Sequence, residues 1–141
     1  MSFESIKNTD AHSTHPRICV VLSAFSPAEL KQLKNVARLT GIGEQIIIDG
    51  SYNATKVLDL LENPSLTPVK TENISTQKAI LFNNVPANRM NAFIESMKKC
   101  RIPRPLIAVV TETSIHWTIE ELISNLAAER IALKNNQTTL H

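Results

Sequence analysis

Histidine and cysteine are the side chains in this sequence best suited to chemistry near neutral pH. His116 stands beside the only tryptophan, Trp117, and could act as a general base or form a ligand-stacking pair with that ring. Cys100 has basic residues on both sides, which lower the pKa of a thiol, whereas Cys19 lies in an apolar run and reads as a small buried hydrophobe. No Ser–His–acid context and no H-E-x-x-H spacing accompanies these residues. We therefore expect no catalytic residue, no metal and no cofactor, and we interpret Trp117 as an apolar plug that closes a helix onto the core.

Polar side chains gather where the apolar runs end, and they are the best candidates for binding a ligand. Residues 49–53 and 111–117 form two polar loops, and two shorter turns lie beside helix N-termini, which favour an anion. These turns contain no glycine, and the sequence has neither G-x-G-x-x-G nor a Walker A loop, so helix capping is the simpler role for their side chains. The candidate ligand-binding residues are Ser23, Asn83, Asn84, Asp49, Thr111 and His116.

Strands and helices must position these loops. Continuous runs rich in β-branched residues predict four strands buried on both faces, at residues 18–22, 46–48, 79–82 and 106–110. Apolar residues recur at helical spacing between and after these runs. The residues Ser26–Glu29 and Thr118–Glu121 form capping boxes at helix starts, and Gly41 suits a helix C-terminus. The predicted order is β-α-β-α twice, which is an α/β fold.

The two halves of the chain align with each other. At an offset of sixty residues Val20 meets Ile80 and Leu33 meets Phe93, and two extra residues then shift the offset to sixty-two. We interpret this registration as a diverged internal duplication. The predicted units are a leader (1–16), a first repeat (17–62), a linker (63–77), a second repeat (78–134) and a tail (135–141).

Joining the halves through their first strands predicts a small, mostly parallel, four-stranded sheet of order 2-1-3-4 flanked by helices. If strands one and three run parallel, the helices of each half lie on opposite faces, and Ser23 and Asn83 line one crevice where doubly wound folds bind ligands. If they run antiparallel, no single crevice forms and each half keeps its own strand-end loops. The long linker also allows two separately packed subdomains, or an exchange of halves between chains.

The composition narrows the class of protein. The chain has 141 residues, of which 43% are hydrophobic and 20% charged, so it can bury a core and is not wholly disordered. No apolar run approaches the roughly 20 residues of a membrane span, and the first residues lack a signal pattern, so we expect a cytoplasmic protein with no membrane partner. A net charge of +2 and 4% aromatic residues make nucleic acid an unlikely partner. A basic stripe, Lys31, Lys34 and Arg38, and a basic cluster around residues 98–104 read as solvated faces or as small surfaces for an acidic partner.

The second half resembles a known bacterial family. A strand at 79–82 leads into a helix, and the run at 106–112, L-I-A-V-V-T-E, is followed by the signature residues Trp117, Thr118 and Glu121. Residues 78 to about 133 are in this respect similar to the domain of unknown function 3783. The sequence departs from the family pattern at Ser114, where asparagine is expected, and at Pro86, where a polar cap is expected. The resemblance implies a cytoplasmic bacterial protein and no particular activity.

Three functions compete on these observations. The first is a non-enzymatic module for protein interaction or self-association, for which a homodimer is one form. The alternative is a small-molecule or anion-binding sensor that uses the strand C-terminal ends. The third is an enzyme that uses His116 or Cys100 within a cleft. We rank them in this order, and an exposed apolar patch would favour the first.

Overall fold

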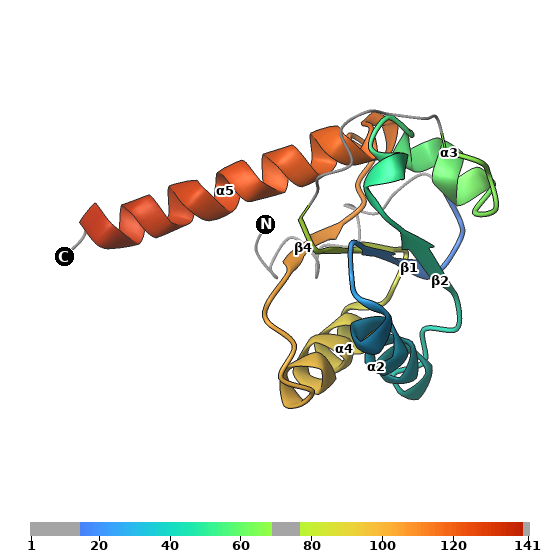
Figure 1. The fold of residues 1–141 in the computed structure, drawn as a ribbon, viewed down its shortest axis with the longest axis horizontal. Coiled ribbons are helices and arrows are strands. Elements are labelled where there is room, and N and C mark those ends of the chain that lie inside the picture. The colour runs from blue at the N-terminus through green and yellow to red at the C-terminus, as the bar shows by residue number, and fades with distance from the viewer. Residues whose placement is uncertain (1–14, 69–76, 140–141) are drawn as a thin grey trace.

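A computed structural model describes residues 15–68 and 77–139 of the chain. It confirms the predicted α/β order of elements, with two short 3₁₀ turns added in the strand-end loops (Figure 1). The elements are β1 (Cys19–Ser23), α2 (Pro27–Leu39), β2 (Gln45–Ile48), η2 (Gly50–Tyr52), α3 (Val57–Glu62), β3 (Ala79–Asn83), α4 (Ala87–Lys99), β4 (Leu106–Val109), η3 (Ser114–His116) and α5 (Ile119–Thr139). Among these described helices, none is long and apolar enough to cross a membrane.

The four strands form one sheet in the predicted order β2-β1-β3-β4. The outer pairs β1–β2 and β3–β4 are parallel, but the central pair β1–β3 is antiparallel, so the junction follows the second of the two arrangements considered. Its register sets Val21 opposite Leu81, with Cys19 opposite Asn83 and Ser23 opposite Ala79. Because these pairs interchange at an offset of sixty residues, an approximate two-fold axis crosses the sheet at the pair Val21–Leu81.

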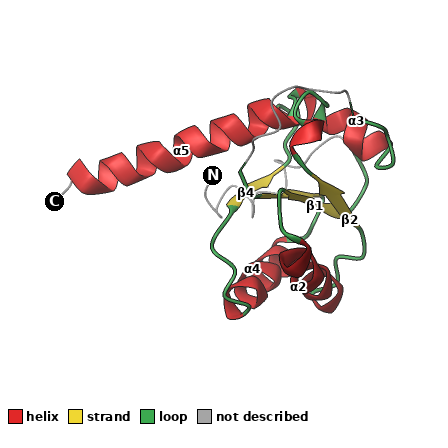
Figure 2. Cartoon of the chain, in the orientation of Figure 1, coloured by secondary structure: helices red, strands yellow, loops and turns green. Residues whose placement is uncertain are grey.

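The helices cover the sheet in two layers (Figure 2). The first helix of each half, α2 and α4, lies on one face, and the second, α3 and α5, lies on the other. The parallel junction, in which equivalent helices of the two halves would lie on opposite faces, is not the one found. A two-fold axis perpendicular to a sheet keeps equivalent helices on the same face, whereas an axis along the strands would exchange the faces.

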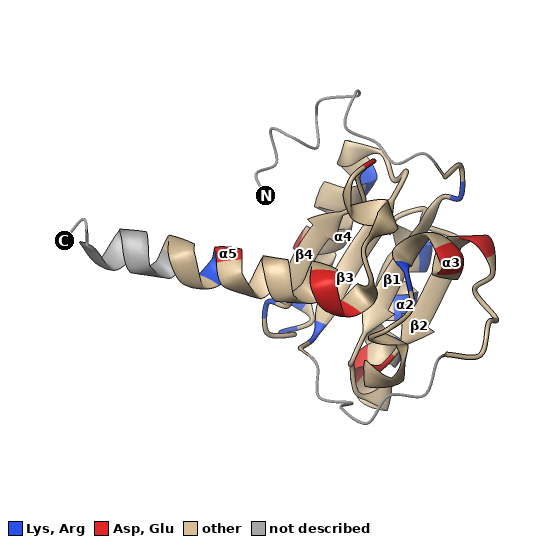
Figure 3. Ribbon diagram, turned by 90° about the horizontal axis from the view of Figure 1, so that it is seen from above, with Lys and Arg blue, Asp and Glu red and all other residues tan. Residues whose placement is uncertain are grey.

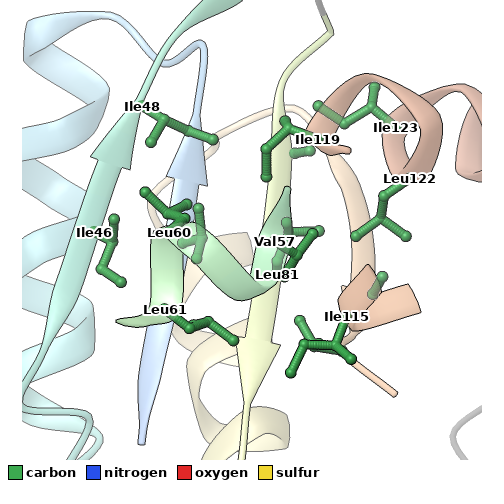
Figure 4. Packing of buried hydrophobic residues seen from close by; sticks show 14 of the residues in the cluster. Ile46, Ile48, Val57, Leu60, Leu61, Leu81, Ile115, Ile119, Leu122 and Ile123 are labelled. Atoms are coloured by element: carbon green, nitrogen blue, oxygen red, sulfur yellow. The ribbon is translucent and has the colours of Figure 1, made fainter. Parts of the chain in front are cut away.

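Each layer buries its own apolar cluster because successive strand residues point to opposite faces. Val20, Leu22, Ile80 and Phe82 pack beneath α2 and α4, where the rings of Phe82 and Phe93 meet edge to face at 5.5 Å. The other cluster, shown in Figure 4, joins alternate strand residues to the apolar sides of α3 and α5. Its labelled members are Ile46, Ile48, Val57, Leu60, Leu61, Leu81, Ile115, Ile119, Leu122 and Ile123.

The turns of the two halves repeat the same backbone conformations. Ala24 and Asn84, sixty residues apart, follow β1 and β3 with φ angles of 67° and 56°. Gly41 and Arg101, again sixty residues apart, end α2 and α4 with φ angles of 84° and 61°. Glycine takes this left-handed conformation without steric cost, so Gly41 fulfils its predicted role and Arg101 takes the same conformation with a side chain.

Helix α5 breaks the symmetry of the halves. It is a helix of 21 residues, whereas its counterpart α3 has 6, and it projects away from the body (Figures 1 and 3). It crosses the boundary predicted at residue 134, so the predicted tail is helical as far as Thr139. Most of the predicted leader (1–16) and residues 69–76 of the predicted linker lie outside the described residues.

Candidate functional site: strand-end loops and the surfaces around them

Ser23 and Asn83 do not form a shared crevice. In the antiparallel register they lie at opposite ends of the β1–β3 pair, and both side chains are fully buried. The crevice expected between them is therefore a wrong prediction, and its cause is the direction of one strand. Two parallel strands would have placed their carboxyl ends side by side at the same end of the sheet, whereas the carboxyl ends of antiparallel strands lie at opposite ends.

Asn83 and Asn84 hold the chain segment that enters β1. The Asn83 amide nitrogen Nδ2 donates to the carbonyl oxygen of Arg17 at 2.6 Å, and that of Asn84 donates to the carbonyl oxygen of His15. Arg17 is held in turn by Glu44, whose carboxylate accepts from Nη1 at 2.7 Å, and by the carbonyl oxygen of Leu61. Through these hydrogen bonds both candidate asparagines tie the segment before β1 to the end of β3.

The Asp49 loop also uses its polar side chain internally. Asp49 is the N-cap of η2, and its Oδ1 accepts from the backbone nitrogen of Ser51 at 2.9 Å and from the Ser51 hydroxyl. These hydrogen bonds hold the pKa of Asp49 below its ordinary value. The carboxylate is exposed, but part of its hydrogen-bonding capacity is occupied by the loop that carries it.

The Thr111 loop closes in a similar way. The Ser114 hydroxyl accepts from the Thr111 backbone nitrogen at 2.9 Å, and the Thr111 hydroxyl accepts from the Ser114 nitrogen at 3.1 Å. The hydroxyl-to-backbone bond expected of Thr111 is thus present, and Ser114 is buried as its reciprocal partner. A serine oxygen suffices for this closure in place of the asparagine that the family pattern led us to expect.

The chain segments that follow the two loops meet over the sheet. Val57 donates its backbone N–H to the carbonyl oxygen of Trp117 at 2.9 Å, and Ile119 donates to that of Thr55 at 2.8 Å. The two bonds interchange at an offset of sixty-two residues, so they lie about the same approximate axis as the central strands. They form a short antiparallel bridge centred on Lys56 and Thr118, which ties α3 to α5.

The signature residues around this bridge are structural. Trp117 is half-buried against the α3–α5 cluster, in agreement with a plug, while His116 beside it is exposed. Thr118 and Glu121 form the predicted capping box, with the Glu121 nitrogen donating to the Thr118 hydroxyl at 3.1 Å and the Thr118 nitrogen to Oε1 of Glu121 at 3.2 Å.

The cysteines differ in their surroundings. Cys19 is fully buried in β1, and burial, aided by the nearby Glu44 carboxylate, raises the pKa of its thiol to about 12. Cys100 is half-buried at the end of α4. Within residues 15–68 and 77–139, no three His, Cys, Asp or Glu side chains come together as a metal site would require.

Two surface features stand out from the rest of the described structure. On α5, Ile131 and Leu133 are each 59% exposed beyond the last buried residue, Leu126. Beside α2, an open hollow of about 1060 Å³ is lined by the basic stripe of this helix. Both features have a counterpart in the sequence. The helical apolar pattern of the last helix continues to Leu133, and the basic residues of α2 recur at helical spacing. The sequence did not show that the body of the protein ends before Ile131 and Leu133, or that the basic residues of α2 border a hollow.

The protein is thus an α/β protein in which the Asp49 and Thr111 loops are closed by their own hydrogen bonds, and the features described above that remain accessible lie on its surface. Residues 78–133, which run from the start of β3 into α5, match the family described as domain of unknown function (DUF3783). This match agrees with the resemblance found in the second half. Searches of curated proteins and of solved structures gave no match to the chain.

Proposed function

We propose that this protein is an interaction module that associates with a second copy of itself through α5 and β4. The observation that carries the proposal is the pair of exposed apolar side chains, Ile131 and Leu133, on the part of α5 that follows its last buried described residue, Leu126. Leu133 follows the buried Leu126 by two helical turns, and Ile131 follows the half-buried Ala127 by one. Leu133 therefore extends the face that is buried nearer the start of the helix, whereas Ile131 lies on the flank of that face where Ala127 packs.

The edge strand β4 lies next to this overhanging helix. The Leu106 and Val110 nitrogens donate to carbonyl oxygens beside and within β3, at Lys78 and Phe82. Because alternate residues of a parallel strand bond to the same neighbour, the backbone N–H and C=O groups of Ile107 and Val109 point away from the sheet. None of the described strands pairs with them.

A second copy of the chain can cover both the exposed apolar side chains of α5 and the unpaired edge of β4. Two β4 strands placed antiparallel about a two-fold axis repeat the geometry of the β1–β3 junction and continue the sheet. Each α5 then extends over the neighbouring copy, where Ile131 and Leu133 lose their contact with water. Apolar helix faces and unpaired strand edges are both features that natural proteins cover by association.

Sedimentation velocity over a range of protein concentrations tests this proposal. We expect the wild-type chain to reach the mass of two copies, and the double variant Ile131→Glu/Leu133→Glu to weaken the association by at least about tenfold because buried charge replaces two apolar anchors. Leu39→Glu is the matched control, since Leu39 is 71% exposed on α2, away from this surface. A wild-type chain that stays at the mass of one copy, or a control that weakens association equally, would contradict the proposal.

The symmetry of the two halves supports a second part of the proposal, that the chain arose by duplication of one β-α-β-α unit. The central register, the left-handed residues and the Val57–Trp117 and Ile119–Thr55 bonds all repeat at the offsets found in the sequence. The sensor alternative used either the Ser23–Asn83 crevice, which the antiparallel junction does not form, or the Asp49 and Thr111 loops, whose polar side chains form hydrogen bonds within their own loops.

A further inference from the structure

We propose that the hollow beside α2 binds an acidic, extended segment of another protein, which adds to the free edge of β2. This surface lies at the edge of the sheet opposite to β4, so it goes beyond self-association and stays accessible when β4 is covered. The hollow is an open groove of about 1060 Å³ between α2 and the start of β2. Its lining includes Lys31, Lys34, Arg38 and Gln45.

Among the described residues, no acidic side chain neutralises the charge of this groove. The three basic side chains recur at helical spacing, so they share one side of α2, and all are exposed. The described residues that line the groove include no aspartate or glutamate, and the ion pairs found in the same part of the chain involve none of the three basic side chains. Glu44, the acidic residue beside Gln45, is engaged by the Arg17 guanidinium at 2.7 Å. The groove therefore favours a negatively charged occupant.

The edge of β2 adds a second recognition element. The Val20 and Ala24 nitrogens of the β1 side donate to the carbonyl oxygens of Glu44 and Ile48. By the alternation of a parallel strand, the N–H and C=O groups of Gln45 and Ile47 point outward, and no described strand pairs with them. An extended peptide can accept and donate hydrogen bonds at such an edge.

Side chains on the α2 face of the sheet also suit an extended peptide bound along β2. Ile47 is paired with Leu22, which packs beneath α2, so the Ile47 side chain projects to the same face and is 39% exposed. In an added strand, alternate side chains face α2, where carboxylates meet the lysines and the arginine. Free backbone groups on β2 and an apolar side chain on the same face as α2 favour a protein segment over nucleic acid. Nucleic acid would also call for base-stacking aromatic residues, which are few in this chain.

Fluorescence anisotropy with a labelled eight-residue peptide of alternating glutamate and threonine tests the proposal on the full chain. We expect binding that weakens at least about tenfold in the variant Lys31→Glu/Lys34→Glu, because both exposed cations become like charges of the peptide. The matched control is Lys98→Glu/Lys99→Glu, which reverses two cations at the end of α4 and leaves affinity within about twofold. Because all four lysines are exposed, circular dichroism is expected to show unchanged folding.

The peptide itself supplies the test of strand addition. Methylating alternate backbone nitrogens removes donors to the β2 edge without altering charge, and we expect about a tenfold loss of affinity. Failure of the glutamate–threonine peptide to bind, or binding unaffected by the Lys31/Lys34 reversal or by methylation, overturns the proposal. A ten-nucleotide oligothymidine that binds as tightly and loses affinity in the same variant overturns it in favour of nucleic acid.

Discussion

At the scale of single residues, the polar side chains that could most readily bind a ligand form hydrogen bonds within the fold instead. Asp49 caps a 3₁₀ turn, Thr111 closes its own loop with Ser114, and Asn83 holds the segment before β1. The sequence displayed these residues correctly as polar groups at strand ends, which is where ligands commonly bind. It could not show that their hydrogen bonds would be satisfied locally, because that depends on loop conformations set by the neighbouring segments.

The two cysteines are expected to react very differently with a thiol reagent. The pKa of Cys19 is raised to about 12, so below that pH the folded protein holds it as the neutral, unreactive thiol. At pH 8 we expect Ellman's reagent to modify Cys100 alone in native protein, and both cysteines in denaturant. The variant Cys100→Ser should lose the native reaction entirely, and a persistent fast reaction in this variant would contradict the assignment.

At the scale of elements, the sequence was most informative where several local signals agreed. Strand β3 begins at the residue predicted, and both capping boxes form at Ser26–Glu29 and Thr118–Glu121. The least predictable property was the direction of β3 beside β1. Both strands are buried on both faces, so their apolar runs satisfy either a parallel or an antiparallel partner, and only the docking of complete halves selects one.

The turn between β1 and α2 offers a test of the repeated backbone geometry. Ala24 has a φ angle of 67°, where an alanine Cβ is crowded by the backbone. We expect Ala24→Gly to raise the free energy of unfolding by about 0.5–1 kcal/mol, measured by urea unfolding. The control Ala28→Gly lies in the first turn of α2 and should lower it by about 0.5–1 kcal/mol. A destabilised Ala24→Gly would show that this turn differs in solution.

At the scale of the whole molecule, the fold is built from two halves that depend on each other. The central strands contribute the register about Val21 and Leu81, and the bridge between Lys56 and Thr118 joins the halves a second time on the α3–α5 face. Neither half covers the inner edge of its own first strand. An isolated β-α-β-α unit, such as the matched residues 78–133, would therefore leave the inner edge of β3 unpaired.

An isolated second half is therefore expected to pair with itself. A fragment of residues 77–139 carrying Ile131→Glu and Leu133→Glu weakens association through α5, and it exposes the inner edge of β3 in addition to the outer edge of β4. Because β1 and β3 hold apolar residues at equivalent positions, Leu81 of two fragments can replace the Val21–Leu81 pair. We expect sedimentation velocity to give the mass of two fragments with helical circular dichroism. A folded fragment at the mass of one copy would contradict this expectation.

The central position of β1 has a consequence for synthesis on the ribosome. Strands β1 and β2 are both complete before the first residue of β3 has been added, and translation adds on the order of ten residues per second. For a few seconds, then, the strand that finishes in the middle of the sheet is an edge strand with an open row of backbone groups. Nascent chains on the same messenger present this row to one another during that interval, before their own β3 arrives to close it.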